Sequence, residues 1–102
     1  MPDQNKICIT VDSDLEDLIP GFLLRKKEDA FSIRLLIEKG DFDQITILGH
    51  SMKGSGGGYG FDRVTELGAL IEVFSKEKNG EKIKKVVNDL CVFLDSIEVV
   101  YE

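Results

Sequence analysis

Apolar side chains recur at intervals of three and four residues through most of this 102-residue chain. That spacing places them on one face of a helix. It predicts four long helices, over about residues 20–39, 42–58, 61–78 and 81–100. Gly40 suits the C-terminal cap of the first helix, and Asn79-Gly80 predicts the turn before the last one.

A shorter helix is expected ahead of these four. It would begin at Asp14, with Ser13 as its N-cap and Glu16 completing a capping box. Residues 1–13 are expected to form an extended N-terminal arm. The β-branched run at residues 7–11 could form a strand, but we find no second strand in the sequence to pair with it.

These elements predict one all-α domain over residues 14–102. Helices joined by short connections pack as an antiparallel four-helix bundle, and the short additional N-terminal helix would lie against one end of it.

The composition narrows the classes of partner. Thirteen basic and nineteen acidic residues give a net charge of −6, so we do not expect a nucleic-acid partner, which requires a basic face. No apolar run is long enough to span a membrane, and the first residues lack the features of a secretion signal. A monomeric cytoplasmic protein is expected. With one histidine and two distant cysteines, no metal site is expected.

The one histidine, His50, lies in the predicted helix 42–58. At about 100° per residue, one set of side chains falls opposite it and a second set falls on its own side. The opposite, core-facing set is Ile45, Leu48, Met52, Gly56 and Tyr59; the set beside His50 is Asp43, Thr46, Lys53, Gly54 and Gly57. The helix therefore presents His50 to solvent.

This arrangement suits phosphoryl transfer. A neutral imidazole is a good nucleophile, and its phosphoramidate can pass the group on. Lys53, three residues later, can supply positive charge to phosphoryl oxygens. Gly54 and Gly57 leave room for the backbone of another protein. Gly56 would instead permit close helix packing, and Gly58 and Gly60 would shape the following turn. The glycine run matches neither a nucleotide-binding loop nor a dinucleotide fingerprint.

The run His50-Ser51-Met52-Lys53-Gly54-Ser55 resembles the signature of the histidine phosphotransfer domains. The resemblance extends over about residues 14–97, and includes the following Gly57, Gly60 and Phe61 and a later Leu70-Ile71-Glu72.

The resemblance implies that His50 accepts a phosphoryl group from a receiver-domain aspartate, or from a histidine kinase system, and passes it to another response regulator receiver. Lys53 would stabilise the phosphoryl group. The partner, a receiver domain or a hybrid histidine kinase, would contact Thr46, Ile47, Gly54, Gly57 and Phe61. It would also carry the Mg²⁺, so no cofactor is expected here, and no autokinase activity.

Two other interpretations stay open. The same surface would suit a docking module that binds or sequesters a receiver domain without catalysis. The glycines could also serve only the packing of a structural helical bundle.

Overall fold

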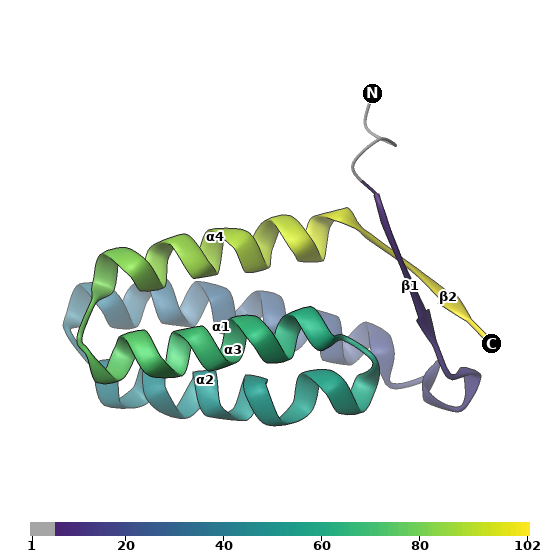
Figure 1. The fold of residues 1–102 in the computed structure, drawn as a ribbon, viewed down its shortest axis with the longest axis horizontal. Helices are drawn as coiled ribbons and strands as arrows, with labels where there is room; N and C mark the ends of the chain where they lie inside the picture. The colour runs from purple at the N-terminus through teal and green to yellow at the C-terminus, as the bar shows by residue number, and fades with distance from the viewer. Residues whose placement is uncertain (1–5) are drawn as a thin grey trace.

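The computed structural model describes residues 6–102, which are mostly helical. Four helices lie side by side and form the helical body of the protein (Figure 1). They are α1 (Ile19–Lys39), α2 (Phe42–Gly56), α3 (Asp62–Lys76) and α4 (Gly80–Ser96). The helices α1 and α3 each pack against both α2 and α4. The four helices predicted from the apolar spacing are confirmed.

The helix ends follow from local capping. Gly40 ends α1 in the left-handed region, at φ 71°, which is costly for any residue with a Cβ. The Asp41 side chain accepts a hydrogen bond of 3.2 Å from the backbone N–H of Gln44 at the start of α2. Asn79 caps α4 in the same way, at 3.1 Å from the nitrogen of Lys82. The predicted ends at Gly40 and Asn79 are confirmed.

A two-stranded parallel ribbon crosses one end of the helical body, where β1 (Ile7–Val11) pairs with β2 (Ile97–Tyr101) (Figure 1). The expectation that residues 7–11 lack a strand partner is therefore wrong, as is the extension of the last helix to Val100. Residues 1–5 of the expected N-terminal arm lie outside the described residues. Most of the partner strand β2 falls within the residues that were predicted as the end of the last helix. In β2 the burial alternates along the strand, with Glu98 and Val100 exposed, so a β-branched run that also fits a helical period pairs as a strand instead.

The ribbon also explains why the short N-terminal helix is smaller than expected. The backbone N–H of Ser13 donates a 2.7 Å hydrogen bond to the carbonyl oxygen of Glu102, beyond β2. Ser13 is therefore tied to the ribbon and does not cap a helix. Only a single 3₁₀ turn, Ser13–Leu15, follows, and Asp12 caps it. The predicted α-helix from Asp14 is wrong.

The connection between α2 and α3 is tight and aromatic. A 3₁₀ turn, Gly57–Tyr59, follows α2 directly, and Gly60 then adopts φ 91°, which confirms its predicted role in the turn. Phe61 comes next and is fully buried. Its ring stacks on Phe22 of α1 at 5.5 Å between centroids, and the Tyr59 ring stacks on Phe22 at 4.5 Å. These contacts fix the C-terminal end of α2 against α1.

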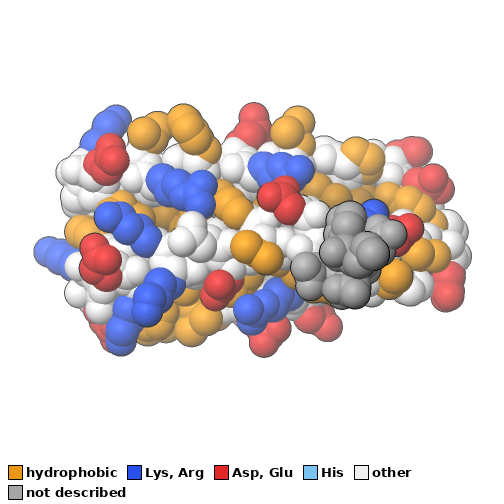
Figure 2. All heavy atoms as spheres, turned by 90° about the horizontal axis from the view of Figure 1, so that it is seen from above, with side chains coloured by type: hydrophobic (Ala, Val, Ile, Leu, Met, Phe, Trp, Pro, Cys, Tyr) orange, Lys and Arg blue, Asp and Glu red, His pale blue; other side chains and the backbone are white. Residues whose placement is uncertain are grey.

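The core draws fully buried side chains from all four helices. The largest are Ile19, Phe22, Ile33, Ile45, Met52, Phe61, Val64, Leu67, Ile71, Ile83, Val87 and Leu90. On the surface seen in Figure 2, Lys and Arg side chains are interspersed with Asp and Glu. None of the helices in residues 6–102 combines the length and the apolar character that crossing a membrane needs.

The ribbon should contribute to stability through Val11, which is 3% exposed. We expect Val11→Ala to lower the free energy of unfolding by about 1–3 kcal/mol, because it removes buried methyl groups. Val100→Ala, at a residue 45% exposed on β2, is the control and should change it by less than about 1 kcal/mol. Urea unfolding measures both. Equal effects would mean that the ribbon does not pack on the helical body.

Candidate functional site

The helices α2 and α3 touch backbone to backbone. A Cβ placed on Gly49 would lie 2.8 Å from the nitrogen of Glu72 and 3.0 Å from the carbonyl oxygen of Gly68. A Cβ placed on Gly68 would lie 2.5 Å from the nitrogen of Lys53. Real Cβ atoms do not approach other atoms so closely, so only glycine permits this helix spacing.

The close approach puts the Glu72 side chain of α3 against the outward side of α2. His50 Nδ1 lies 3.0 Å from Glu72 Oε2, and Lys53 Nζ donates a 2.8 Å hydrogen bond to Glu72 Oε1. Lys76 Nζ is farther away, at 3.9 Å from Oε2. The Glu72 side chain is 12% exposed, whereas that of His50 is 70% exposed. One nearly buried carboxylate thus holds an exposed imidazole and a lysine.

The bond to Glu72 selects one tautomer of neutral His50. An ionised carboxylate only accepts hydrogen bonds, so the proton of the neutral ring sits on Nδ1, which donates to Glu72. Nε2 then carries the lone pair. Since most of the imidazole is exposed, the geometry leaves Nε2 as a nucleophile on the solvent side of α2.

The charge on Glu72 is stabilised by its partners. The hydrogen bond from Lys53 is the main reason that the pKa of the Glu72 carboxyl is held below its ordinary value. Burial acts in the opposite direction, and the hydrogen bond from His50 adds to the lowering of the pKa. Glu72 is therefore ionised at neutral pH, as the tautomer argument requires.

Gly54 lies in open space on the His50 side of α2. A Cβ there would meet no atom within 4 Å. At Gly57, a Cβ would make only ordinary contacts of 3.6 Å, with Asp62 and Thr65. Gly56 is different, because its Cβ would lie 2.6 Å from the nitrogen of Thr65, which confirms its predicted packing role. No contact within residues 6–102 requires glycine at Gly54.

The other predicted contact residues divide into surface and interior. Ile47 is 59% exposed on the outward side of α2. Thr46 is half-buried, and its Oγ1 lies 2.7 Å from Oγ of Ser75 on α3, so it joins the two helices. Phe61 is fully buried against Phe22. It belongs to the core, which corrects its expected place at a partner surface.

Two charged residues of the site were assigned no function from the sequence, although Glu72 ends the run Leu70-Ile71-Glu72 named there. Glu72 and Lys76 lie on α3, four residues apart and therefore on one face of that helix. Gly68 lies one turn before Glu72. It was the one sign in the sequence that another helix packs here, because a glycine inside an apolar helical pattern often marks a close backbone approach. The sequence alone did not show which helix approaches it.

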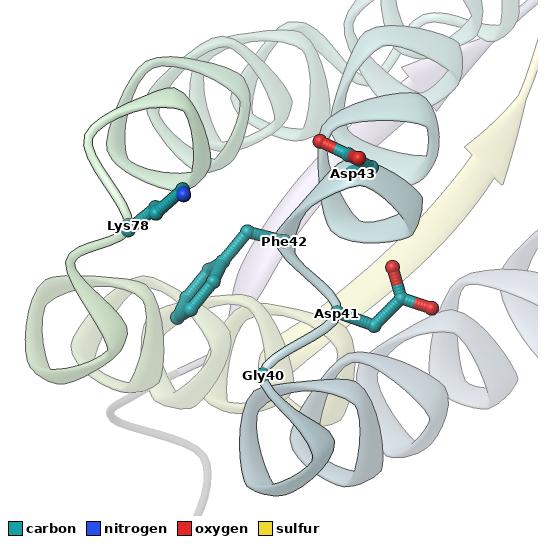
Figure 3. A pocket seen from close by; sticks show the side chains of 5 residues that line it. All are labelled: Gly40, Asp41, Phe42, Asp43 and Lys78. Atoms are coloured by element: carbon teal, nitrogen blue, oxygen red, sulfur yellow. The ribbon is translucent and has the colours of Figure 1, made fainter.

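The described residues offer little to a metal ion or a small ligand near His50. No cluster of three or more His, Cys, Asp or Glu side chains that could hold a metal occurs within residues 6–102. A hollow of about 210 Å³ lies where the α1–α2 turn meets the α3–α4 turn. Its lining consists of Gly40, Asp41, Phe42, Asp43 and Lys78 (Figure 3) and includes none of the predicted site residues.

In comparisons with known proteins, no family model, no curated protein and no solved structure matches this chain.

The glycines of α2 should respond oppositely to alanine. Gly54→Ala should raise the free energy of unfolding by about 0.5–1 kcal/mol, because Ala favours the helix and meets open space. Gly49→Ala should lower it by about 1–3 kcal/mol, because the new methyl group forces α2 away from α3. Thermal and urea unfolding compare the two variants. A stabilising Gly49→Ala would contradict the backbone contact described above.

The lowered pKa of Glu72 predicts a pH dependence of stability. A carboxyl with a lower pKa in the folded than in the unfolded state stabilises the fold above the unfolded-state pKa, and this contribution is lost as the pH falls through the folded-state pKa. Glu72→Gln should therefore be less stable than the wild type at pH 7, and the difference should shrink as the pH falls below 4.5. Urea unfolding at pH 7, 5 and 3 tests this. A difference that grows on acidification would be inconsistent with a lowered pKa.

Proposed function

We propose that this protein is a histidine phosphotransfer protein, whose helical body is an antiparallel four-helix bundle of that class. His50 accepts a phosphoryl group from the aspartyl phosphate of a receiver domain, or from a histidine kinase system, and donates it to another response regulator receiver. One observation supports this best: Glu72 holds Nδ1 of the exposed His50 at 3.0 Å, which leaves Nε2 to react.

In the proposed reaction, Nε2 attacks the phosphorus atom of the aspartyl phosphate in line. The Nε2–P bond forms as the P–O bond to the aspartate breaks, and the aspartate leaves as a carboxylate. The proton stays on Nδ1, so the phosphorylated ring is cationic. Glu72 stabilises that positive charge through the same hydrogen bond. The reverse steps deliver the group to the next receiver.

Lys53 supports the phosphoryl group in this proposal. Its ammonium has three N–H donors, and one of them is used by Glu72. Its side chain is 42% exposed, so the remaining donors can reach phosphoryl oxygens on the solvent side. The partner receiver supplies the Mg²⁺ and most of the charge that the transfer needs.

The glycines define where the partner approaches. Helix-interior glycine costs about 0.8–1.0 kcal/mol relative to alanine, yet no packing in the described part of the chain requires it at Gly54. A receiver whose backbone comes close to α2 would explain the residue. Ile47, exposed on the same side of α2, supplies an apolar contact.

The central experiment is phosphotransfer from a radiolabelled, phosphorylated receiver in the presence of Mg²⁺. The wild type should acquire a label that is acid-labile and base-stable, and His50→Gln should acquire none. Circular dichroism and unfolding of His50→Gln provide the control for folding. If the label persists in that variant, the assignment of His50 fails. If wild type and His50→Ala bind a receiver equally and no donor labels either, the protein is instead a docking module.

Side-chain size at Gly54 should control transfer without affecting the fold. Gly54→Gln places a long side chain beside His50, and we expect the transfer rate to fall by about tenfold or more, because the partner is kept from its reactive distance. Gly54→Ala adds only a methyl group and is the matched control, with a much smaller effect. Single-turnover transfer kinetics measure both. Equal rates for Gln and Ala would exclude a close approach at Gly54.

A further inference from the structure

The outward face of α1 carries an apolar stripe formed by Leu24, Phe31 and Leu35. These side chains are 59%, 64% and 45% exposed. Their spacing of seven and four residues puts them within about 40° of one another around the helix. Phe22 and Ile33, on the opposite side of α1, are buried in the core. The stripe is therefore left over after the core is complete, and such surfaces commonly mark interaction sites.

The apolar stripe is separate from the surface around His50. Beside the stripe, Lys27 Nζ lies 3.9 Å from Asp95 Oδ1, and Arg34 donates a 3.0 Å hydrogen bond to Asn88. Both acceptors are on α4, so one side of the stripe borders α4. His50 instead contacts α3. A partner seated over His50 does not need to cover the stripe.

We propose that the apolar stripe binds a second copy of this chain, in place of the monomer expected from the sequence, with the two α1 helices parallel and a two-fold axis running along them. In this arrangement Leu24, Phe31 and Leu35 each meet their own counterpart. The three side chains recur at intervals of seven and four residues on one side of α1, so the two copies bury them against each other.

The charges beside the stripe favour this arrangement. Relative to Leu24, the side chains of Lys27 and Glu38 are turned about 40–60° toward the α4 side, and those of Glu28 and Lys39 by a similar angle toward the other side. With a two-fold axis parallel to α1, the α4 side of the stripe in one copy faces the other side of the stripe in the second copy. Residues with nearly the same number then lie at the same level along the two helices. Lys27 then meets Glu28 of the second copy, and Glu38 meets Lys39. The two-fold axis makes each pair occur twice.

The antiparallel alternative fits less well. With the axis through Phe31, it would bring Lys27 close to Arg34 of the second copy, because both lie on the α4 side of the stripe. Like charges placed together disfavour that pairing. The parallel arrangement is thus the one that the charges of α1 match.

The interface is small. One helical stripe offers less than the roughly 800 Å² per partner of a standard stable interface. We therefore expect a weak dimer, with a Kd on the order of 100 µM. The dimer does not depend on the proposed function, and it leaves both copies of His50 free.

Sedimentation equilibrium from about 10 µM to about 1 mM of the intact chain tests the proposal, since this range brackets the expected Kd. The wild type should pass from monomer to dimer. Phe31→Gln should raise the Kd at least about tenfold, because it places a polar side chain at the centre of the apolar contact. Val73→Gln changes an exposed apolar residue on α3, a helix that packs against α2 and α4, and should leave the Kd unchanged. A wild type that stays monomeric at the highest concentration overturns the proposal, as does an equal effect of the two variants.

Charge reversal then tests the orientation. In the parallel dimer, Lys27→Glu sets two acids together and should weaken association severalfold. Adding Glu28→Lys to the same chain should restore it. In an antiparallel dimer, Lys27→Glu would instead place a carboxylate close to Arg34 of the second copy and strengthen association. That result would overturn the parallel arrangement. Urea unfolding of each variant confirms that the fold is unchanged.

Discussion

The backbone contact between Gly49 of α2 and Gly68 of α3 is the constraint on which the candidate site depends. With no Cβ on either residue, the two helices come closer than ordinary side chains allow. Glu72 follows Gly68 by one turn, so its carboxylate meets α2 at the level of His50 and Lys53. A single methyl group at either glycine would push the helices apart and lengthen both hydrogen bonds. Helix packing and site chemistry are therefore set by the same few atoms.

Glu72 then connects burial with reactivity. A carboxylate that is 12% exposed is stable only when its oxygens are hydrogen-bonded, and here Oε1 and Oε2 have separate donors. Because Lys53 neutralises much of its charge, Glu72 stays ionised while it orients His50. Nδ1 of the imidazole is hydrogen-bonded to Glu72, whereas Nε2 is left without a bond to that carboxylate. A surface histidine without such an acceptor would populate both tautomers and rotate freely.

The parts of the structure that depend on local sequence were predictable, and those that depend on distant pairing were not. Apolar spacing located the four helices, and helical geometry correctly predicted that His50 is exposed. The ribbon was missed because β1 and β2 come from opposite ends of the chain, and β2 also fits a helical period. The role of Glu72 was missed because it depends on the rotation of α3 against α2. Phe61 was placed at the surface by its position in a motif, whereas the turn at Gly60 directs it into the core.

The glycines of α2 and the turn after it look alike in sequence, and only their surroundings separate them. Gly49 and Gly56 each face backbone atoms closer than a Cβ tolerates, so the fold itself accounts for them. A Cβ at Gly54 or Gly58 would meet no atom of residues 6–102 within 4 Å, and neither residue has a left-handed backbone. Gly54, inside the helix, weakens α2 by about the usual penalty for helix-interior glycine, and no contact among the described residues compensates for it. The proposed phosphotransfer offers a reason for this glycine that lies outside the chain. Gly54 follows His50 by one turn, so in that proposal it leaves room for the partner that reaches the imidazole.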